Sequence, residues 1–381
     1  MDATLILIFV ILSAVTALFI ISYFRKSPAS PREDAASDYA EGLNLLLEGN
    51  SDGALKKLRS AVKKDSTNVN AYLKIGDILR QSGEVTRAIN VHKYLTVRTG
   101  LTRKQKNDVL YSLASDYKEA RQFDKALSVA EQVLQENSEE SWARTMKLQC
   151  LEQKEEWGQA FQALREFDRK QHKSNFRLAL YRVEEGVKLM AERREKEARS
   201  RFKEAIKIAP ECPPPYIHLA DAYLSEERNQ EALEVLRQFI ERNPDQSYLA
   251  FERLKELLYQ GGVYSEIENV YLEIIEQQPD NLQAHLALVE NYEKKGEIEK
   301  AIDVCSEILD RDGTNQVAKK YLVQLYHRTG DDKAAVNMAL ELINGSIEQK
   351  NNFRCRECNY ESDEIFWRCP HCLAWETATR N

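Results

Sequence analysis

Most of this chain follows the hydrophobic period of amphipathic helices arranged in pairs. Three segments show the pattern clearly, each as an apolar helix, a short polar turn and a second helix: AYLKIGDILRQSGEVTRAINVHKYL (71–95), PYIHLADAYLSEERNQEALEVLRQFIERNP (215–244) and AHLALVENYEKKGEIEKAIDVCSEIL (284–309). Second helices open with a small residue that recurs in steps of 34 to 38 residues, at Ala54, Ala88, Ala126, Ala160, Ala198, Ala232, Ala301 and Ala335, with Ile267 in the seventh unit. The sequence therefore predicts about nine helix pairs over residues 35–345.

The recurring small residue has a packing reason, because two antiparallel helices approach closely only where one side chain is small. Twelve residues earlier, Gly or Ala on the first helix supplies the other half of the contact: Gly42, Gly76, Ala114, Gly186 and Ala220. Pro210, Pro244 and Pro279 end second helices, since proline cannot continue them. These residues at this spacing resemble the tetratricopeptide repeat. The resemblance implies an all-α fold, a superhelical solenoid.

First helices of such a solenoid line a concave surface that binds peptides or proteins. The repeat register predicts nine residues on this surface, of mixed charge and size: Asp77, Arg80, Tyr111, Lys118, Gln149, Asp221, Leu224, Glu290 and Lys294. They include no strongly basic set of the kind that clamps a carboxylate terminus, so the sequence does not name the ligand.

Residues 4–24, TLILIFVILSAVTALFIISYF, carry no charge. Twenty-one residues at about 1.5 Å each reach across a hydrocarbon core of about 30 Å, so we expect a transmembrane helix. A cleaved signal peptide is disfavoured, because Asp2 but no Lys or Arg precedes the run, and the run is longer than a signal peptide's apolar region. Arg25 and Lys26 follow it, which places the C-terminal side in the cytoplasm.

Composition and motif content argue against two classes of function for the cytoplasmic part, nucleic-acid binding and catalysis. The net charge is −7 and Lys and Arg form no stripe, so we expect no nucleic-acid binding. The six histidines are scattered, and no phosphate-binding glycine loop is present. His92 falls at a repeat core position, and the charged run 193–201 is expected to be a solvated helix face. We therefore expect a protein that is not an enzyme.

Four of the seven cysteines form the spacing C-x2-C-x10-C-x2-C: Cys355, Cys358, Cys369 and Cys372. Two such pairs on opposing hairpins can aim four thiolates at one tetrahedral metal ion, either iron or zinc. Two disulfides are the alternative, and a reducing cytoplasm disfavours them. The pairs resemble the knuckles of rubredoxin, in which Gly usually follows the second Cys in a left-handed conformation. Asn359 and Leu373 stand there in this chain, and Leu adopts that conformation at a cost.

About thirty residues bury too little surface to fold without help, and the metal supplies part of that help. Four large aromatic residues of the module also need a surface to cover: Phe353, Phe366, Trp367 and Trp375. The linker 344–352 is short, so we expect this surface on the last repeats.

The whole chain resembles the lipopolysaccharide assembly protein B family, also called LapB or YciM. The resemblance is carried by RCRECNY and FWRCPHCLAW in the cysteine module and by SDYAEGLNLLLEGNSDGALKKL (37–58) and GEVTRAINVHKYL (83–95) in the repeats. It implies a transmembrane anchor (1–24), a cytoplasmic linker (25–34), repeats (35–345) and a rubredoxin-like metal-knuckle domain (346–381). It also implies a single-pass protein of the bacterial inner membrane, with repeats and metal domain in the cytoplasm.

The resemblance further implies an adaptor. Its partners would be the membrane protease FtsH, the lipid A deacetylase LpxC and a regulatory inner-membrane protein, and it would promote degradation of the deacetylase. The alternative is a scaffold that assembles envelope enzymes without proteolysis; an electron carrier is disfavoured. A homodimer is left open.

The flanking charges predict a topology that reporter fusions can test. A reporter at the C-terminus that works only in the cytoplasm should be active, because Arg25 and Lys26 hold their side of the span in the cytoplasm. A periplasmic reporter at the same position should be silent. The opposite result would reverse the assigned orientation.

Overall fold

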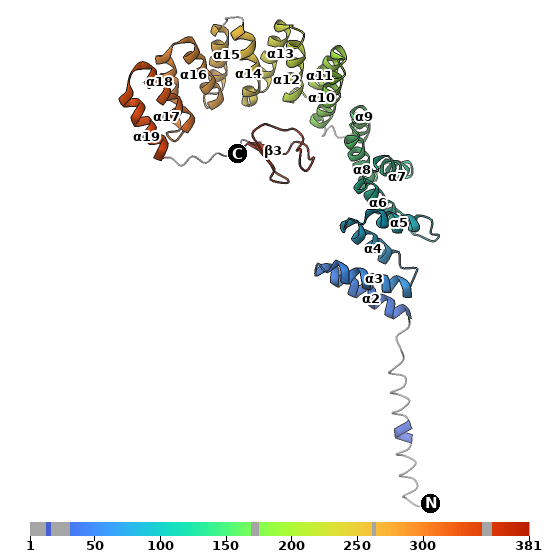
Figure 1. The fold of residues 1–381 in the computed structure, drawn as a ribbon. Helices are drawn as coiled ribbons and strands as arrows, with labels where there is room; N and C mark the ends of the chain where they lie inside the picture. The colour runs from blue at the N-terminus through green and yellow to red at the C-terminus, as the bar shows by residue number, and fades with distance from the viewer. Residues whose placement is uncertain (1–12, 17–30, 169–174, 261–263, 345–352, 381) are drawn as a thin grey trace, which may run out of the picture. The chain divides into compact units, whose positions relative to one another are not determined.

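The computed structural model describes residues 13–16, 31–168, 175–260, 264–344 and 353–380 (Figure 1). It divides into two compact units, residues 1–163 and residues 164–381. Among the described residues, no helix is long and apolar enough to cross a membrane. The predicted span, residues 4–24, lies outside the described residues except for positions 13–16.

Helices α2 to α19 form successive antiparallel pairs, as the repeat pattern predicts (Figure 1). In the first unit they are α2 (Pro31–Leu47), α3 (Ser51–Lys64), α4 (Val69–Gln81), α5 (Val85–Thr96), α6 (Arg103–Glu119), α7 (Phe123–Glu136), α8 (Ser141–Gln153) and α9 (Trp157–Phe167), which reaches the division between the units. In the second unit they are α10 (Asn175–Ala191), α11 (Glu195–Ile208), α12 (Pro213–Leu224), α13 (Asn229–Arg242), the 3-10 helix η1 (Pro244–Ala250), α14 (Phe251–Gln260), α15 (Tyr264–Gln277), α16 (Leu282–Lys295), α17 (Ile298–Arg311), α18 (Gln316–Thr329) and α19 (Asp332–Asn344).

The C-terminal module contains a small sheet of three short strands. They are β1 (Phe353–Cys355), β2 (Glu361–Ser362) and β3 (Ala378–Arg380), in the order β2-β1-β3. Both neighbours pair antiparallel with β1: Phe353 lies opposite Ser362 on one side and opposite Arg380 on the other. Backbone hydrogen bonds between these strands hold the module together, but few of its hydrophobic side chains are buried: Phe353, Cys355 and Cys369.

The recurring small residue is buried in every unit. Each of the nine positions lies on a second helix with at most 7% of its surface exposed, and Ile267 is fully buried. The glycines twelve residues earlier contact a different residue from the one expected. A β-carbon on Gly42 would lie 2.9 Å from Leu58 Cγ, and one on Gly76 or Gly186 would overlap the ring of His92 or Phe202. These partners stand one turn after the small residue, so the close contact spans two positions of the second helix.

In each of the eight turns that the structure describes between paired helices, one residue is left-handed. Glycine supplies it in four described turns, at Gly49, Gly83, Gly296 and Gly330 with φ between 76° and 82°. In four consecutive units between them an ordinary residue takes that conformation: Arg121, Glu155, Arg193 and Glu227, with φ between 54° and 60°. Since a side chain in this region costs roughly 1–2 kcal/mol, the middle repeats form strained turns.

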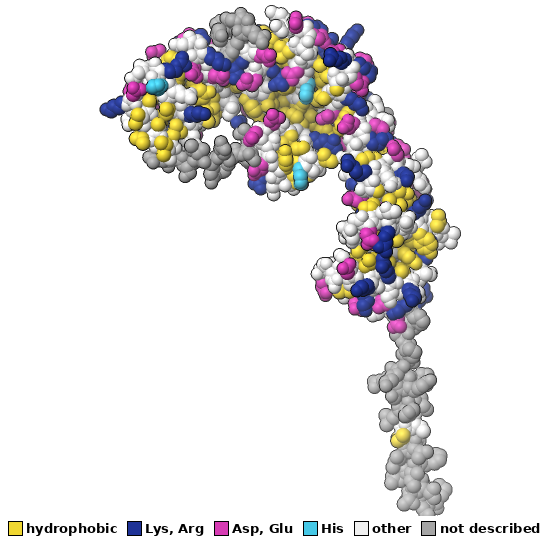
Figure 2. Space-filling model, in the orientation of Figure 1, with side chains coloured by type: hydrophobic (Ala, Val, Ile, Leu, Met, Phe, Trp, Pro, Cys, Tyr) yellow, Lys and Arg dark blue, Asp and Glu magenta, His cyan; other side chains and the backbone are white. Residues whose placement is uncertain are grey.

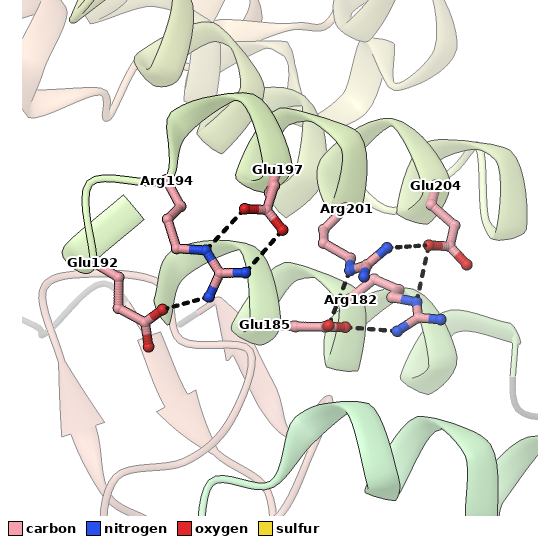
Figure 3. Close-up of polar contacts among 7 residues, drawn as sticks. All are labelled: Arg182, Glu185, Glu192, Arg194, Glu197, Arg201 and Glu204. Carbon is pink, nitrogen blue, oxygen red and sulfur yellow. Dashed lines mark hydrogen bonds and ion pairs between the residues drawn. The ribbon is translucent and has the colours of Figure 1, made fainter. Parts of the chain in front are cut away.

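The charged run 193–201 is not simply a solvated face, which corrects the expectation. Arg201 closes a ring of ion pairs with Glu185, Arg182 and Glu204 that ties α10 to α11 (Figure 3). Arg199 is largely buried and pairs with Glu226 in the turn that follows α12. Arg194, by contrast, is half exposed and bridges Glu192 and Glu197 (Figure 3). Part of the run therefore joins neighbouring helices, because arginine can bridge two carboxylates at once.

A buried polar network joins α4, α5 and α6 in the first unit. His92 is fully buried, as its core position predicts, but its ring is not packed only against apolar groups. Its Nδ1 lies 2.5 Å from the buried carboxylate of Asp116, and its Nε2 lies 3.3 Å from the carbonyl of Leu73. Arg80 binds the other oxygen of Asp116 at 2.9 Å and binds Asp77 at 2.8 Å. The Asp116 carboxylate and the Leu73 carbonyl thus face the two ring nitrogens of His92, so the ring links α5 to both α4 and α6.

Gly76→Ala should destabilise the first unit, because the new methyl group overlaps the His92 ring that closes the network. Overpacking of this kind costs about 1–3 kcal/mol, more than the roughly 1 kcal/mol that alanine gains over glycine in a helix. Thermal unfolding followed by circular dichroism measures the loss. Gly313→Ala is the matched control, because its β-carbon would meet only Leu309 O at 3.6 Å. Equal melting of the two variants would contradict the close packing described.

Candidate metal centre and concave surface

Two knuckles carry the four cysteines, and their backbone geometry is nearly the same. In the first, the amide of Asn359 donates to the carbonyl of Cys355, and the amide of Cys355 donates to the carbonyl of Tyr360. In the second, Leu373 and Ala374 make the equivalent bonds with Cys369. Asn359 and Leu373 are left-handed, with φ of 58° and 60°, as the knuckle pattern predicts. Each knuckle therefore turns two sulfurs toward one side of the chain.

The four sulfur atoms fit one tetrahedral ion. They lie within 4.8 Å of one another, and Sγ–Sγ is 3.7 Å both for Cys355 with Cys372 and for Cys358 with Cys369. A tetrahedron with metal–sulfur bonds of about 2.3 Å has edges of about 3.8 Å. All four thiols are free, and these distances are far beyond a disulfide bond of about 2.05 Å. The geometry is that of a four-cysteine metal site.

Hydrogen bonds favour the thiolate at Cys355. Burial alone raises the pKa of this thiol, but bonds from the hydroxyl of Thr377 and the amides of Cys358 and Glu357 outweigh burial and lower the pKa to about 6. Thr377 Oγ1 lies 3.1 Å from Cys355 Sγ and is itself buried. A deprotonated sulfur is the form that binds metal, so Thr377 and the knuckle amides favour this form at Cys355. At Cys358 and Cys372 the pKa is raised instead, because the amides of Tyr360 and Ala374 are outweighed by burial and by the neighbouring cysteines.

Two tryptophans join the module to the repeats. Trp375 packs edge-on against the buried ring of Tyr181, with centroids 5.6 Å apart, and Trp367 packs against Phe176 at 6.4 Å. Both also contact the hydrophobic core of the second unit. The other two aromatic residues predicted for docking have a different setting: Phe353 is buried on β1, and Phe366 packs against Tyr360 inside the module.

The module contacts the middle of the array rather than the last repeats, which corrects the expectation drawn from the short linker. The partners Phe176 and Tyr181 lie on α10, and Arg380 stacks over Tyr248 of η1 at 5.2 Å. In Figure 1 the module lies inside the arc of the second unit. Residues 345–352 can span roughly 30 Å when extended, so a short linker still allows the module to reach back across this arc.

All nine residues predicted for the concave surface lie on first helices, α4, α6, α8, α12 and α16. Most of them bind one another or the next first helix along the chain. Lys118 donates to Gln149 at 3.0 Å, the ring of Tyr111 packs against Trp142, and Asp221 accepts two bonds from Arg253 at 2.5 and 2.8 Å. Glu290 binds Lys255 at 2.8 Å and Lys294 at 2.9 Å, whereas Leu224 packs against the core. The structure thus shows a ladder of polar bridges between successive units.

Sequence reasoning missed the other halves of these bridges: Asp116, Trp142, Arg253 and Lys255. A signal was present, because residues of opposite charge stood one repeat apart on first helices. Arg80 and Asp116 are separated by 36 positions, Asp221 and Arg253 by 32, and Lys255 and Glu290 by 35. Charges that recur with the repeat period therefore identify neighbours across the solenoid surface.

The face shown in Figure 2 carries Lys and Arg interspersed with Asp and Glu over both units, which agrees with the mixed charge of the sequence.

Cys305 is fully buried, and burial raises its pKa to about 12, as expected for a thiol at a repeat core position. Asp312 lies in the turn between the end of α17 at Arg311 and the start of α18 at Gln316, where its carboxylate accepts from both the amide and the hydroxyl of Thr314.

Known protein families and relatives match both the repeats and the metal module of this chain. A family model described as a rubredoxin metal binding domain matches residues 353–378, and two tetratricopeptide repeat models match residues 39–91 and 189–256. The chain is 25% identical over 360 residues to lipopolysaccharide assembly protein B of Escherichia coli (strain K12), covering 93% of this chain and 92% of that protein. It is 24% identical over 370 residues to lipopolysaccharide assembly protein B of Haemophilus influenzae, with the same coverage.

Solved structures of repeat proteins are also similar to it. A tetratricopeptide repeat protein from Parabacteroides merdae matches with a TM-score of 0.36 and 16% identity, covering 68% of this chain and 99% of that chain.

Cys355→Ser should release the metal and free the module from α10. A serine hydroxyl is a poor ligand beside a thiolate, and four-cysteine sites contribute on the order of 10 kcal/mol of folding free energy in zinc-finger peptides. We expect lower metal content, altered tryptophan fluorescence and faster proteolysis between α19 and β1.

Trp375→Ala separates the two roles of the module, because it keeps all four thiolates and removes the contact with Tyr181. Its metal content should match the wild type while its proteolysis between α19 and β1 increases. A centre built only for electron transfer would instead leave the cleavage pattern of Cys355→Ser unchanged.

Proposed function

Because the chain is a homologue of lipopolysaccharide assembly protein B, with tetratricopeptide repeats followed by a rubredoxin-like metal site, we propose that it is a membrane-tethered cytoplasmic adaptor. It regulates lipopolysaccharide biosynthesis by promoting FtsH-dependent proteolysis of the deacetylase LpxC. The observation that carries this proposal is the match over 93% of the chain, which extends through the repeats and the metal module together.

The repeats supply the contact surface of the adaptor. Tetratricopeptide repeats mediate protein–protein interactions, and the first helices of such arrays present the surface that partners use. We assign partner binding to the polar ladder, in which Asp221, Glu290 and Lys294 line an open pocket with Arg253 and Lys255. Ion pairs within the ladder hold these side chains in place before a partner arrives. Less side-chain freedom is then lost on binding, which favours affinity.

The metal module supports this surface instead of carrying out chemistry. Its tryptophans cover apolar rings of α10 that the repeats would otherwise expose. The ion fixes the two knuckles, and the segments on either side of the second knuckle carry Trp367 and Trp375 to the repeats. Loss of the ion should therefore disturb partner binding through the fold of the second unit.

The tether at residues 4–24 acts through local concentration. An adaptor, a membrane protease and a substrate that share one membrane surface meet far more often than three soluble molecules. Residues 1–24 therefore contribute to the function of the adaptor and do more than target it to the membrane. They also offer a regulatory inner-membrane protein a contact within the bilayer.

The half-life of the deacetylase tests the proposal. In cells that lack this protein, the deacetylase should persist several times longer after protein synthesis is blocked, and the full chain should restore rapid loss. A variant without residues 1–24 should fold but restore little. Unchanged half-life together with disturbed lipopolysaccharide synthesis would favour the non-proteolytic scaffold, and full rescue by the truncated chain would rule out a need for the tether.

A further inference from the structure

A groove runs between the second helices α13 and α15, apart from the first helices that carry the polar ladder and from the metal module. It encloses about 670 Å³. Twelve residues of the two helices line it: Gln230, Glu231, Leu233, Glu234, Arg237, Gln238, Ile240, Glu241, Val270, Glu273, Ile274 and Gln277. The proposed adaptor function makes no use of this side of the array.

The floor of the groove is apolar. Leu233 and Ile240 stand seven residues apart on α13, and Val270 and Ile274 stand four apart on α15, so each helix offers one row of aliphatic side chains. Leu233 and Ile240 are half-buried, whereas Val270 and Ile274 are buried. Two parallel apolar rows with a gap between them accept a third row of similar side chains.

The rim of the groove is acidic. Glu234 and Glu241 on one side and Glu273 on the other are exposed, and no ion pair with any of them is found in the part of the chain that the structure describes. The two remaining charged lining residues are already paired, Glu231 with Arg228 and Arg237 with Glu266. Three uncompensated carboxylates thus face solvent around an apolar floor.

The groove coincides with the irregular seventh unit. There Ile267 replaces the small residue of the other second helices, and the 3-10 helix η1 directly precedes the first helix α14. A bulkier side chain at the closest contact alters how a second helix seats on its unit. The groove therefore lies beside the unit that departs from the repeat pattern, and it is lined by second helices only.

We propose that this groove binds a cationic amphipathic helix of a partner protein. The apolar stripe of such a helix would lie between the two aliphatic rows, and its flanking Lys or Arg residues would meet Glu234, Glu241 and Glu273. This helix-in-groove mode needs apolar anchors at positions i, i+4 and i+7, which match the spacing of the floor residues. The charge of the rim disfavours nucleic acid and anionic lipid, because both carry negative charge.

Fluorescence anisotropy of a labelled peptide tests the proposal. The probe is a 16-residue helix with leucines at i, i+4, i+7 and i+11 and lysines on both flanks; its counterpart carries glutamate in place of lysine. The protein is the full chain in nanodiscs of zwitterionic lipid, which give the lysine peptide no charged surface. The lysine peptide should bind, more weakly as salt rises, and the glutamate peptide should not.

Charge reversal locates the site. The variant E234K/E241K/E273K should weaken binding by about tenfold or more, since three favourable pairs become repulsive. The control E299K/D303K/E307K makes the same charge change on exposed positions of α17 that do not line the groove, and it should bind nearly as the wild type does. Equal loss in both variants would show attraction to the overall charge and overturn the site.

Two further variants keep the test decisive if the reversed protein folds poorly. The neutral E234Q/E241Q/E273Q should also weaken binding and remove most of its salt dependence. Leu233→Ser should weaken binding several-fold without changing that salt dependence, because it alters only the apolar floor. Unchanged affinity in both of these variants would overturn the proposal, whatever the behaviour of the charge-reversed protein.

Discussion

The close approach of two helices at a small side chain is the contact on which the rest of this protein depends. Each unit places a buried Ala, or Ile267, against its partner helix, and a glycine in three units admits Leu58, His92 or Phe202 one turn later. Because every helix pair is held by the same contact, the first helices of successive units lie at a regular spacing along the array. That regularity brings Arg80 to Asp116 and Lys255 to Glu290, so the polar ladder follows from the apolar contact.

The metal module depends on the array as much as on its ion. Four sulfurs fix two knuckles, but the module's own interior is too small to hold Trp367 and Trp375, which pack, partly buried, against α10. Metal binding and repeat packing are therefore linked through two side chains. Loss of the metal should therefore loosen the packing on α10, and disruption of α10 should weaken metal binding. This linkage gives a small metal site a structural role in a long repeat array.

Local patterns in the sequence predict local structure well here. The small-residue period predicts every helix pair, and the cysteine spacing predicts both knuckles, including left-handed Leu373. Each depends on residues close in the chain or on a fixed period. The position of the module on α10 was not predictable in this way, since it depends on the curvature of the second unit. The network around His92 was missed for a related reason: a core position predicts burial, but the partner Asp116 comes from a neighbouring helix.

The strained turns have a consequence for how the array opens. Arg121, Glu155, Arg193 and Glu227 hold left-handed turns in four consecutive units, whereas glycines serve the described turns on both sides of them. In a linear array each unit is held only by its neighbours, so the weakest hairpins decide where cooperativity breaks. If the chain is pulled from a tethered end or by an unfolding ATPase, the helix pairs with these four strained turns would therefore unfold first. The two glycine-turned ends would persist as separate folded blocks, each still closed by its own helix contacts.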